Sequence, residues 1–161
     1  MARILLLTLL LGQSPAPDPC SSPEYRQFDF WVGEWVVHSP QGRQVGTNRI
    51  RKIEGGCGLE ENWTASTGTT GRSLNAYHAT TGRWVQHWVG AGGSILLLEG
   101  TYDGEKMTLA GQSAPRVKDR ITWSRLPAGK VRQLWEQSSD GGQSWKVAFD
   151  GIYSRREAPK E

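Results

Sequence analysis

Residues that favour tight turns recur along the chain from residue 40 onward and leave short runs between most of them, the pattern expected of hairpin-linked strands. Glycine occupies most of these turns, which lie at 40–42, 55–56, 67–68, 81–82, 92–93, 103–104, 127–129 and 140–142. The runs between them are rich in Trp, Val, Thr, Leu and Tyr, and none carries an uninterrupted helical period. This pattern predicts short antiparallel strands rather than helices.

Ten strands are predicted from these runs, at 30–38, 45–53, 59–65, 73–79, 83–90, 94–102, 106–112, 118–126, 130–138 and 144–155. Because every connection is short, successive strands are expected to pair as neighbours. A meander of this length leaves exposed edges unless it closes, so we predict a single antiparallel up-and-down β-barrel over 28–156. Residues 17–27 are interpreted as a linker and 157–161 as a polar tail. Eight Trp and 20 Gly in 161 residues agree with one all-β domain.

The first 16 residues have the organisation of a secretory signal peptide. Arg3 supplies the positive start, residues 4–11 the apolar stretch, and residues 13–16 a small-residue exit. The apolar stretch is shorter than the ~20 residues that span a bilayer, so no membrane span is expected. We therefore predict an exported protein, periplasmic or extracellular. The alternative is a buried N-terminal strand or helix.

Two cysteines, Cys20 and Cys57, remain in the exported chain. In an oxidising compartment, an even and low number of cysteines indicates a disulfide. The predicted bridge joins the segment before the barrel to the loop around residues 55–58. The alternative is two unrelated free thiols.

Side chains alternate across a strand, so the distribution of charge selects the inward face of each strand. Burying many unpaired charges is too costly, and the charged set is assigned to solvent: Arg83, His87, Glu99, Lys106, Arg132, Glu136, Lys146 and Asp150. The opposite set is assigned to the interior: Tyr77, Trp84, Trp88, Leu96, Leu98, Tyr102, Met107, Leu109, Val131, Trp135, Trp145, Val147, Phe149 and Tyr153.

Several polar residues fall on the inward face beside aromatic ones. Buried amides and carboxylates need hydrogen-bond partners, which are either one another or a ligand. We predict a ligand-binding site formed by Glu61, Trp63, Asn75, Tyr77, Gln86, Trp88, Arg120, Gln133 and Trp135. Arg120 and Thr122 are placed inward, although Ile121 and Trp123 compete for the same face. The alternative is a filled core whose polar groups satisfy one another.

Residues 28–35, Phe-Asp-Phe-Trp-Val-Gly-Glu-Trp, resemble the glycine-x-tryptophan opening of calycin-type barrels, which include lipocalins and nitrobindin-like proteins. Together with 56–63, 73–77, 82–88 and 132–153, they resemble a family of exported bacterial lipocalin-like β-barrel proteins. The resemblance covers nearly the whole mature chain. It implies a barrel that holds a small apolar or amphipathic molecule, and no particular activity. In calycins this Trp closes the barrel floor, and an Arg of the last strand packs over it. The resemblance implies that Trp35 is this Trp and that Arg155 or Arg156 is this Arg.

Residues 138–145 resemble the Asp-box turn of sialidase propellers, in which Asp and Ser bond to the backbone and the Trp packs beneath. The motif occurs once, so we interpret it as a structural hairpin turn rather than as part of a repeat-built propeller or a glycan site.

Other chemistry is not indicated. Lys and Arg are scattered at a net charge of +3, which does not provide the basic stripe of a nucleic-acid partner. The two cysteines and the three histidines His38, His78 and His87 do not cluster, so no metal or cofactor is predicted. Nitrobindin-like proteins bind haem through a histidine late in the chain, and none follows His87 here. No nucleophile elbow or phosphate loop is present, so no catalytic residue is assigned.

The first hypothesis is therefore an exported binding barrel for a small apolar or amphipathic molecule. A second is a barrel-cavity enzyme, of isomerase or cyclase type, in which a desolvated Glu61 acts as base. In the simpler alternative, Glu61 pairs with Arg120 and does no chemistry. A third hypothesis is a structural or interaction protein with a filled core. The ligand and the oligomeric state are left open.

Overall fold

The structure is a computed structural model that describes residues 19–157. The strands are β1 (Gly33–His38), β2 (Gln44–Ile53), β3 (Gly58–Ala65), β4 (Thr70–His78), β5 (Arg83–Gly90), β6 (Ile95–Tyr102), β7 (Lys106–Ala114), β8 (Val117–Arg125), β9 (Val131–Ser138) and β10 (Lys146–Arg155). The 3-10 helices are η1 (Pro23–Arg26), η2 (Asp29–Trp31), η3 (Glu54–Gly56) and η4 (Pro127–Gly129). The signal peptide predicted at 1–16 lies outside the described residues.

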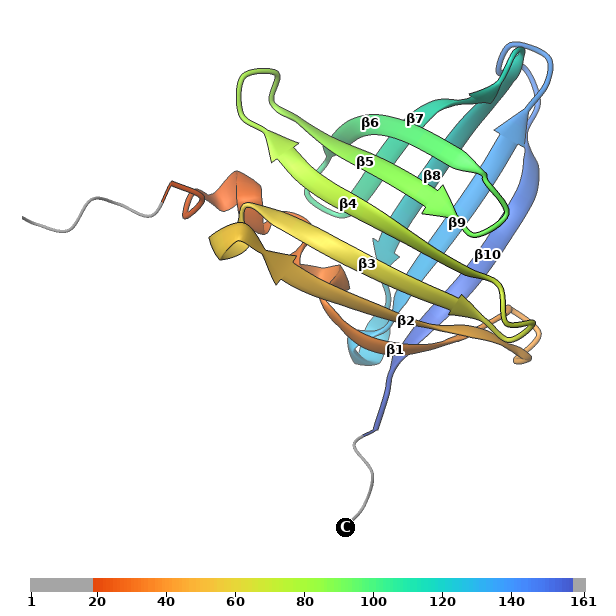
Figure 1. Cartoon of the computed structure of the whole chain (residues 1–161), viewed down its shortest axis with the longest axis horizontal. Coiled ribbons are helices and arrows are strands. Elements are labelled where there is room, and N and C mark those ends of the chain that lie inside the picture. The colour runs from red at the N-terminus through yellow and green to blue at the C-terminus, as the bar shows by residue number, and fades with distance from the viewer. Residues whose placement is uncertain (1–18, 158–161) are drawn as a thin grey trace, which may run out of the picture.

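The ten strands form one closed antiparallel barrel (Figure 1). Each strand pairs with the next in the chain, and β10 pairs back with β1. The predicted all-β up-and-down barrel is confirmed, and all ten predicted strands are present within a few residues of their expected bounds. The main difference lies at the start of β1, where residues 29–31 form η2 instead of continuing the strand.

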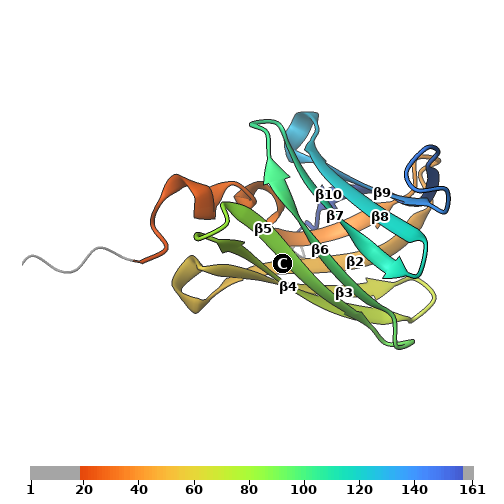
Figure 2. The same cartoon turned by 90° about the horizontal axis from the view of Figure 1, so that it is seen from above.

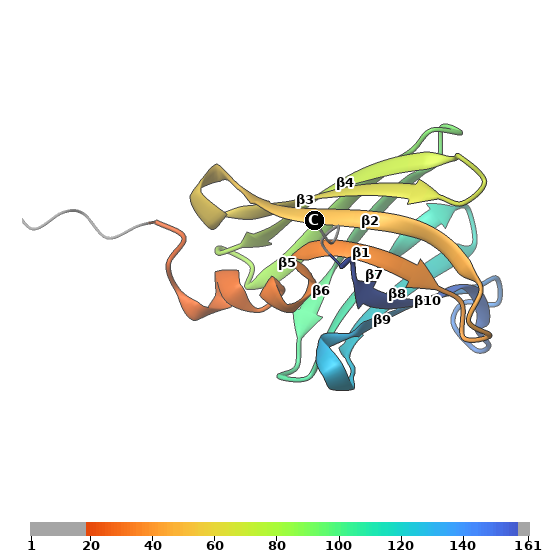
Figure 3. The same cartoon turned by 90° about the horizontal axis from the view of Figure 1, so that it is seen from below.

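The barrel has two unlike ends, which Figures 2 and 3 show from opposite sides. At one end, here called the floor, η1 and η2 lie beside the connection between β2 and β3 and the connection between β4 and β5. At the other end, here called the rim, lie the hairpins that join β1 to β2, β3 to β4, β5 to β6, β7 to β8 and β9 to β10.

Aromatic side chains close the floor. Phe28 stacks on Trp31 with ring centroids 4.9 Å apart, and meets Trp84 and Trp123 edge-on at 5.6 and 5.1 Å. All four side chains are at most 1% exposed. A strand would turn neighbouring side chains to opposite faces of the wall, whereas η2 lets Phe28 and Trp31 both enter the barrel. This is the physical reason for the late start of β1.

The junction of β1 and β10 is held by Arg155. Its guanidinium carbon lies 4.0 Å from the centroid of the Trp35 ring, and its Nη1 donates to the carbonyl of Val32 at 2.6 Å. Gly33 makes this approach possible, because a Cβ there would overlap the guanidinium and the φ of Gly33 is +145°. Of the two arginines offered by the sequence, Arg155 is the one that covers Trp35.

The predicted disulfide between Cys20 and Cys57 is present. Arg26 of η1 reinforces the same junction, since its Nη2 donates to the carbonyl of Cys20 at 2.8 Å and to that of Gly56 at 2.5 Å. These bonds attach the segment before the barrel to the connection between β2 and β3. They therefore hold the aromatic rings of the floor against the strand ends.

The inward placement of Trp145 and Val147 is wrong. Val147 is 61% exposed and pairs with the outward Glu136, whereas Phe149 packs against the core. The pairing of β10 with β9 shifts between Val147 and Phe149, where Ala148 is the extra residue of a β-bulge. A bulge inverts the alternation of side chains, so residues before it face the opposite way from the prediction.

The turn before β10 forms as its Asp-box resemblance implies. Asp140 Oδ1 accepts the backbone N–H groups of Gln143 and Ser144 at 2.9 Å, and Ser138 Oγ accepts that of Gly142 at 2.8 Å. The hydroxyl and amide groups of Ser144 hold the pKa of Asp140 well below its ordinary value. The segment is a structural hairpin turn, as interpreted from the sequence.

Replacing Cys20 and Cys57 together by serine tests the attachment of the floor. We expect the free energy of unfolding to fall by about 2–4 kcal/mol, because the cross-link no longer restricts the unfolded chain between two residues 37 positions apart. Urea unfolding of the variant and of chemically reduced wild type measures this. Unchanged stability in both would show that the Arg26 hydrogen bonds alone secure the junction.

Candidate functional site

A cavity of about 630 Å³ lies inside the barrel and opens toward the rim. Its lining residues are Glu61, Trp63, Gln86, Trp88, Gly93, Ser94, Ile95, Leu96, Ser113, Ile121, Gln133, Trp135, Gln137, Ala148, Phe149 and Tyr153. The volume falls in the range of small-molecule sites, roughly 300–1,000 Å³. Most of the lining is aromatic or aliphatic, with a few amide groups and one carboxyl group.

Glycine at two inward positions keeps this space open. A Cβ at Gly46 would overlap the ring of Trp63, and a Cβ at Gly71 would overlap the ring of Trp88. Each indole therefore lies over the backbone of a neighbouring strand, and the ring of Trp63 also meets that of Phe149 of β10 edge-on at 5.7 Å. The aromatic residues form the wall of the cavity without filling it.

Glu61 lies on the cavity wall, 3% exposed, at the end of a chain of hydrogen bonds. Gln86 Nε2 donates to Asn75 Oδ1 at 2.8 Å, and Asn75 Nδ2 donates to Ser73 Oγ at 2.9 Å. The Ser73 hydroxyl donates to Glu61 Oε2 at 2.6 Å, and Asn48 Nδ2 donates to Oε1 at 2.7 Å. All donors in this chain are directed toward Glu61, so the network favours its ionised form.

Asn48 joins Glu61 to a second branch. Its Nδ2 also lies 3.3 Å from the hydroxyl of Tyr153, which in turn donates to Gln133 Oε1. The remaining amide atom, Asn48 Oδ1, is buried and accepts no hydrogen bond. Asn48 is not among the residues that line the cavity, so this acceptor lies behind the wall.

Two opposing effects set the pKa of Glu61. Burial raises it, while the hydrogen bonds from Ser73 and Asn48 lower it; burial is the larger, and the pKa is about 7 instead of 4.5. Burial and the nearby Glu61 charge raise the pKa of Tyr153 well above its ordinary value. Among the described residues that line the cavity, Glu61 is thus the group that changes charge near neutral pH.

Six of the nine predicted site residues line the cavity: Glu61, Trp63, Gln86, Trp88, Gln133 and Trp135. Asn75 is 1% exposed and lies behind the wall, where it orients Ser73. Tyr77 lies at the floor, with its ring centroid 5.3 Å from that of Tyr25 and 6.2 Å from that of Trp84. Neither side chain contributes to the cavity lining.

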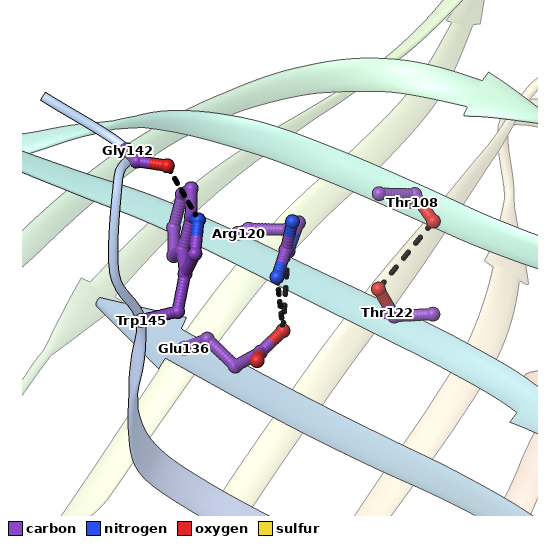
Figure 4. Close-up of polar contacts among 6 residues, drawn as sticks. All are labelled: Thr108, Arg120, Thr122, Glu136, Gly142 and Trp145. Atoms are coloured by element: carbon purple, nitrogen blue, oxygen red, sulfur yellow. Dashed lines mark hydrogen bonds and ion pairs between the residues drawn. The ribbon is translucent and has the colours of Figure 1, made fainter. Parts of the chain in front are cut away.

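The inward placement of Arg120 and Thr122 is wrong (Figure 4). Arg120 donates from Nε and Nη2 to Glu136 Oε2 at 3.1 and 2.9 Å, and its guanidinium carbon lies 4.2 Å from the ring centroid of Trp145. The hydroxyl of Thr122 meets that of a threonine of β7 on the same outer face. A guanidinium needs a counter-charge, and Glu136 supplies it outside the barrel, so the proposed pairing of Arg120 with Glu61 does not form.

Strand β8 instead turns Asp119 inward, a carboxylate that was not predicted for the interior. It is 0% exposed. Its Oδ1 accepts Trp135 Nε1 at 2.8 Å and Gln137 Nε2 at 3.0 Å, and its Oδ2 accepts the backbone N–H of Ser113 at 2.8 Å. Asp119 therefore fixes the orientation of a cavity-lining indole. Its place two residues before the apolar Ile121 is the sequence signal that identifies it.

The chain was compared with known protein families and with curated proteins, and neither comparison found a match. Within residues 19–157, no helix has the length and apolar character needed to cross a membrane. In the same part of the chain, no group of three or more His, Cys, Asp and Glu side chains is placed to hold a metal ion.

The pKa of Glu61 implies that stability falls as pH rises. The folded carboxyl keeps its proton up to about pH 7, whereas the unfolded one loses it near 4.5. Between these values the folded state binds more protons, so the Glu61 contribution to the unfolding free energy decreases by about 3 kcal/mol. We expect Glu61→Gln to remove this decrease, as measured by urea unfolding across that pH range.

Glu60→Gln is the matched control for Glu61→Gln. Glu60 lies on the outer face of the same strand, 27% exposed, with Oε2 3.7 Å from Arg51 Nη2. Its variant should follow the pH dependence of wild type, because its side chain pairs with Arg51 on the outer face and is not part of the Glu61 cluster. Parallel curves for wild type and Glu61→Gln would contradict the raised pKa.

Asp119→Asn tests the second interior carboxylate. The new amide presents an N–H group to a hydrogen-bond donor, so we expect a loss of about 1–3 kcal/mol in unfolding free energy. The control is Glu99→Gln, which weakens an exposed ion pair with Arg83 on the outer face and should cost less than about 1 kcal/mol. Equal losses in denaturant unfolding would count against a structural role specific to Asp119.

Proposed function

We propose that the mature chain is an exported barrel of the calycin type that binds a small apolar or amphipathic molecule in the cavity beneath its rim. The supporting observation is the joint presence, in one cavity of about 630 Å³, of three indole walls and the Glu61 hydrogen-bonded cluster. Aromatic walls provide apolar contact area, and a few convergent polar groups orient a bound molecule.

The packing of the barrel supports a binding role over a filled core. A core without a ligand reaches the density of an organic crystal by filling its interior with side chains. Here Gly46 and Gly71 accept the indoles of Trp63 and Trp88 against the wall, which leaves volume at the centre.

The disulfide supports the exported location. Disulfides persist in oxidising compartments and are rare where thiols are kept reduced. The bridge between Cys20 and Cys57, which joins the segment before the barrel to the connection between β2 and β3, would persist in such a compartment.

Native mass spectrometry tests the proposal. We expect the mature protein, purified gently from its own host, to carry a discrete extra mass that is lost on denaturation. The mass identifies the chemical class of the ligand. A bare polypeptide mass, repeated after exposure to a mixed lipid and metabolite extract, would overturn the binding function.

Two neighbouring substitutions separate the cavity from the outer surface. Ala148 lines the cavity, whereas Val147 is 61% exposed on the outer face. We expect Ala148→Trp to reduce the ligand-bound fraction about tenfold or more, because an added indole occupies the ligand volume. Val147→Trp should bind as wild type does, and equal occupancy of the two variants in native spectra would place the ligand elsewhere.

A further inference from the structure

The ionisable side chains that line the cavity are all acidic among the described residues. Among the described residues that line it, Glu61 and Tyr153 are the ionisable ones, and none is Lys, Arg or His. The basic side chains of β10 are not part of the lining: Arg155 covers Trp35 at the floor, and Lys146, which pairs with the cavity-lining Gln137, is exposed at the rim. An anionic ligand would meet no counter-charge within the cavity, whereas a cationic ligand would meet Glu61.

The aromatic walls favour a cation as well. Trp63, Trp88 and Trp135 line the same cavity as Glu61. The face of an aromatic ring attracts positive charge, and indole does so more strongly than the other aromatic side chains. This attraction increases where water is excluded, as it is beside a carboxyl group that is 3% exposed.

The carboxylate oxygens of Glu61 can accept further hydrogen bonds from a donor in the cavity. Glu61 Oε1 accepts a bond from Asn48 and Oε2 accepts one from Ser73, although a carboxylate oxygen has two lone pairs. A primary ammonium group is purely a donor, with three N–H bonds, and matches this surplus of acceptors.

We propose that the barrel selects an organic ammonium ion, a protonated primary amine attached to a flat apolar body. The ammonium group lies against Glu61, and the apolar body lies between the indoles of Trp63, Trp88 and Trp135. This inference rests on the proposed function and names the ligand class of the same cavity.

Binding of the cation is coupled to ionisation of Glu61. The groups that face Glu61 are Asn48 of β2, Ser73 of β4 and Tyr153 of β10, and Tyr153 stays protonated at neutral pH. The other interior carboxylate, Asp119 of β8, is occupied by three donors near the rim. A bound ammonium ion favours the charged carboxylate, so binding near pH 7 releases protons, and affinity rises as pH increases through 7.

The test uses three probes that share an indole body and differ in charge: tryptamine (cationic), tryptophol (neutral) and indole-3-acetate (anionic). Isothermal titration calorimetry is carried out at pH 7 on mature protein whose native mass is that of the polypeptide alone. We expect tryptamine to bind about tenfold or more tighter than tryptophol, and indole-3-acetate to bind most weakly. Titrations in two buffers of different ionisation enthalpy measure the protons released.

Glu61→Gln separates the charge from the cavity. The variant should lose the preference for tryptamine and the proton release, while its affinity for tryptophol stays within about twofold of wild type. Glu60→Gln, on the outer face of the same strand, should keep both properties. Its wild-type behaviour excludes a long-range effect of net charge.

The outcomes distinguish the two proposals. Binding of tryptophol as tight as that of tryptamine, or an unchanged preference in Glu61→Gln, would overturn the ammonium assignment and leave the cavity as a binding site. Failure of all three probes to bind at millimolar concentration would overturn the ammonium assignment and count against the cavity as a binding site. Native mass spectra of host-purified protein then decide whether any ligand binds.

Discussion

Pairing of β1 with β10 is the constraint on which the rest of the structure depends. Without it both strands would be exposed edges, open to pairing with other chains. The register sets Trp35 opposite Arg155, and the guanidinium lies over the indole because Gly33 leaves room for it. Closure turns the sheet into a tube, so that each inward side chain faces other walls of the same sheet.

A closed sheet separates the carboxylates into two chemical environments. Those on the outer face pair across strands with arginine, as in Arg83 with Glu99, Arg120 with Glu136 and Arg132 with Asp150. The most exposed of these pairs, Arg83 with Glu99, contributes little to stability. The two interior carboxylates, Glu61 and Asp119, are held by neutral amide, hydroxyl and indole donors instead. The interior thus holds two acidic groups, and none of the described residues that line the cavity is basic.

The sequence predicts the fold well because turn spacing and alternation are local properties. Alternation predicts the wrong face where the pairing of two strands is irregular. In the pairing of β10 with β9, Ala148 is an extra residue, and nothing in the local sequence marks it as a bulge. It also fails on β8, where Lys118, Asp119 and Arg120 put charges on both faces. Sorting by charge cannot orient such a strand, and the cross-strand partner Glu136 decides its orientation.

The candidate site is predicted less completely for a related reason. Alternation identifies Glu61 and the indoles as inward, but the bonds to Glu61 depend on registers between strands. Ser73 of β4 pairs directly with Glu61. On the other side, Asn48 of β2 pairs with Trp63, the next inward residue of β3 after Glu61. Small polar residues in strands carry no local mark of this role, so neither was assigned to the site.

The Glu61 cluster has a thermodynamic cost that bears on its purpose. Its donors favour the carboxylate and burial opposes it, and burial prevails, so the cluster is least favourable to folding above neutral pH. Apolar residues of similar volume generally stabilise a core at least as well as buried charged groups do. A barrel that needed only stability would fill this space, whereas a binding barrel keeps polar groups at a stability cost because a ligand repays their desolvation. A bound molecule, as proposed above, would account together for the buried carboxyl group and the open volume beside it.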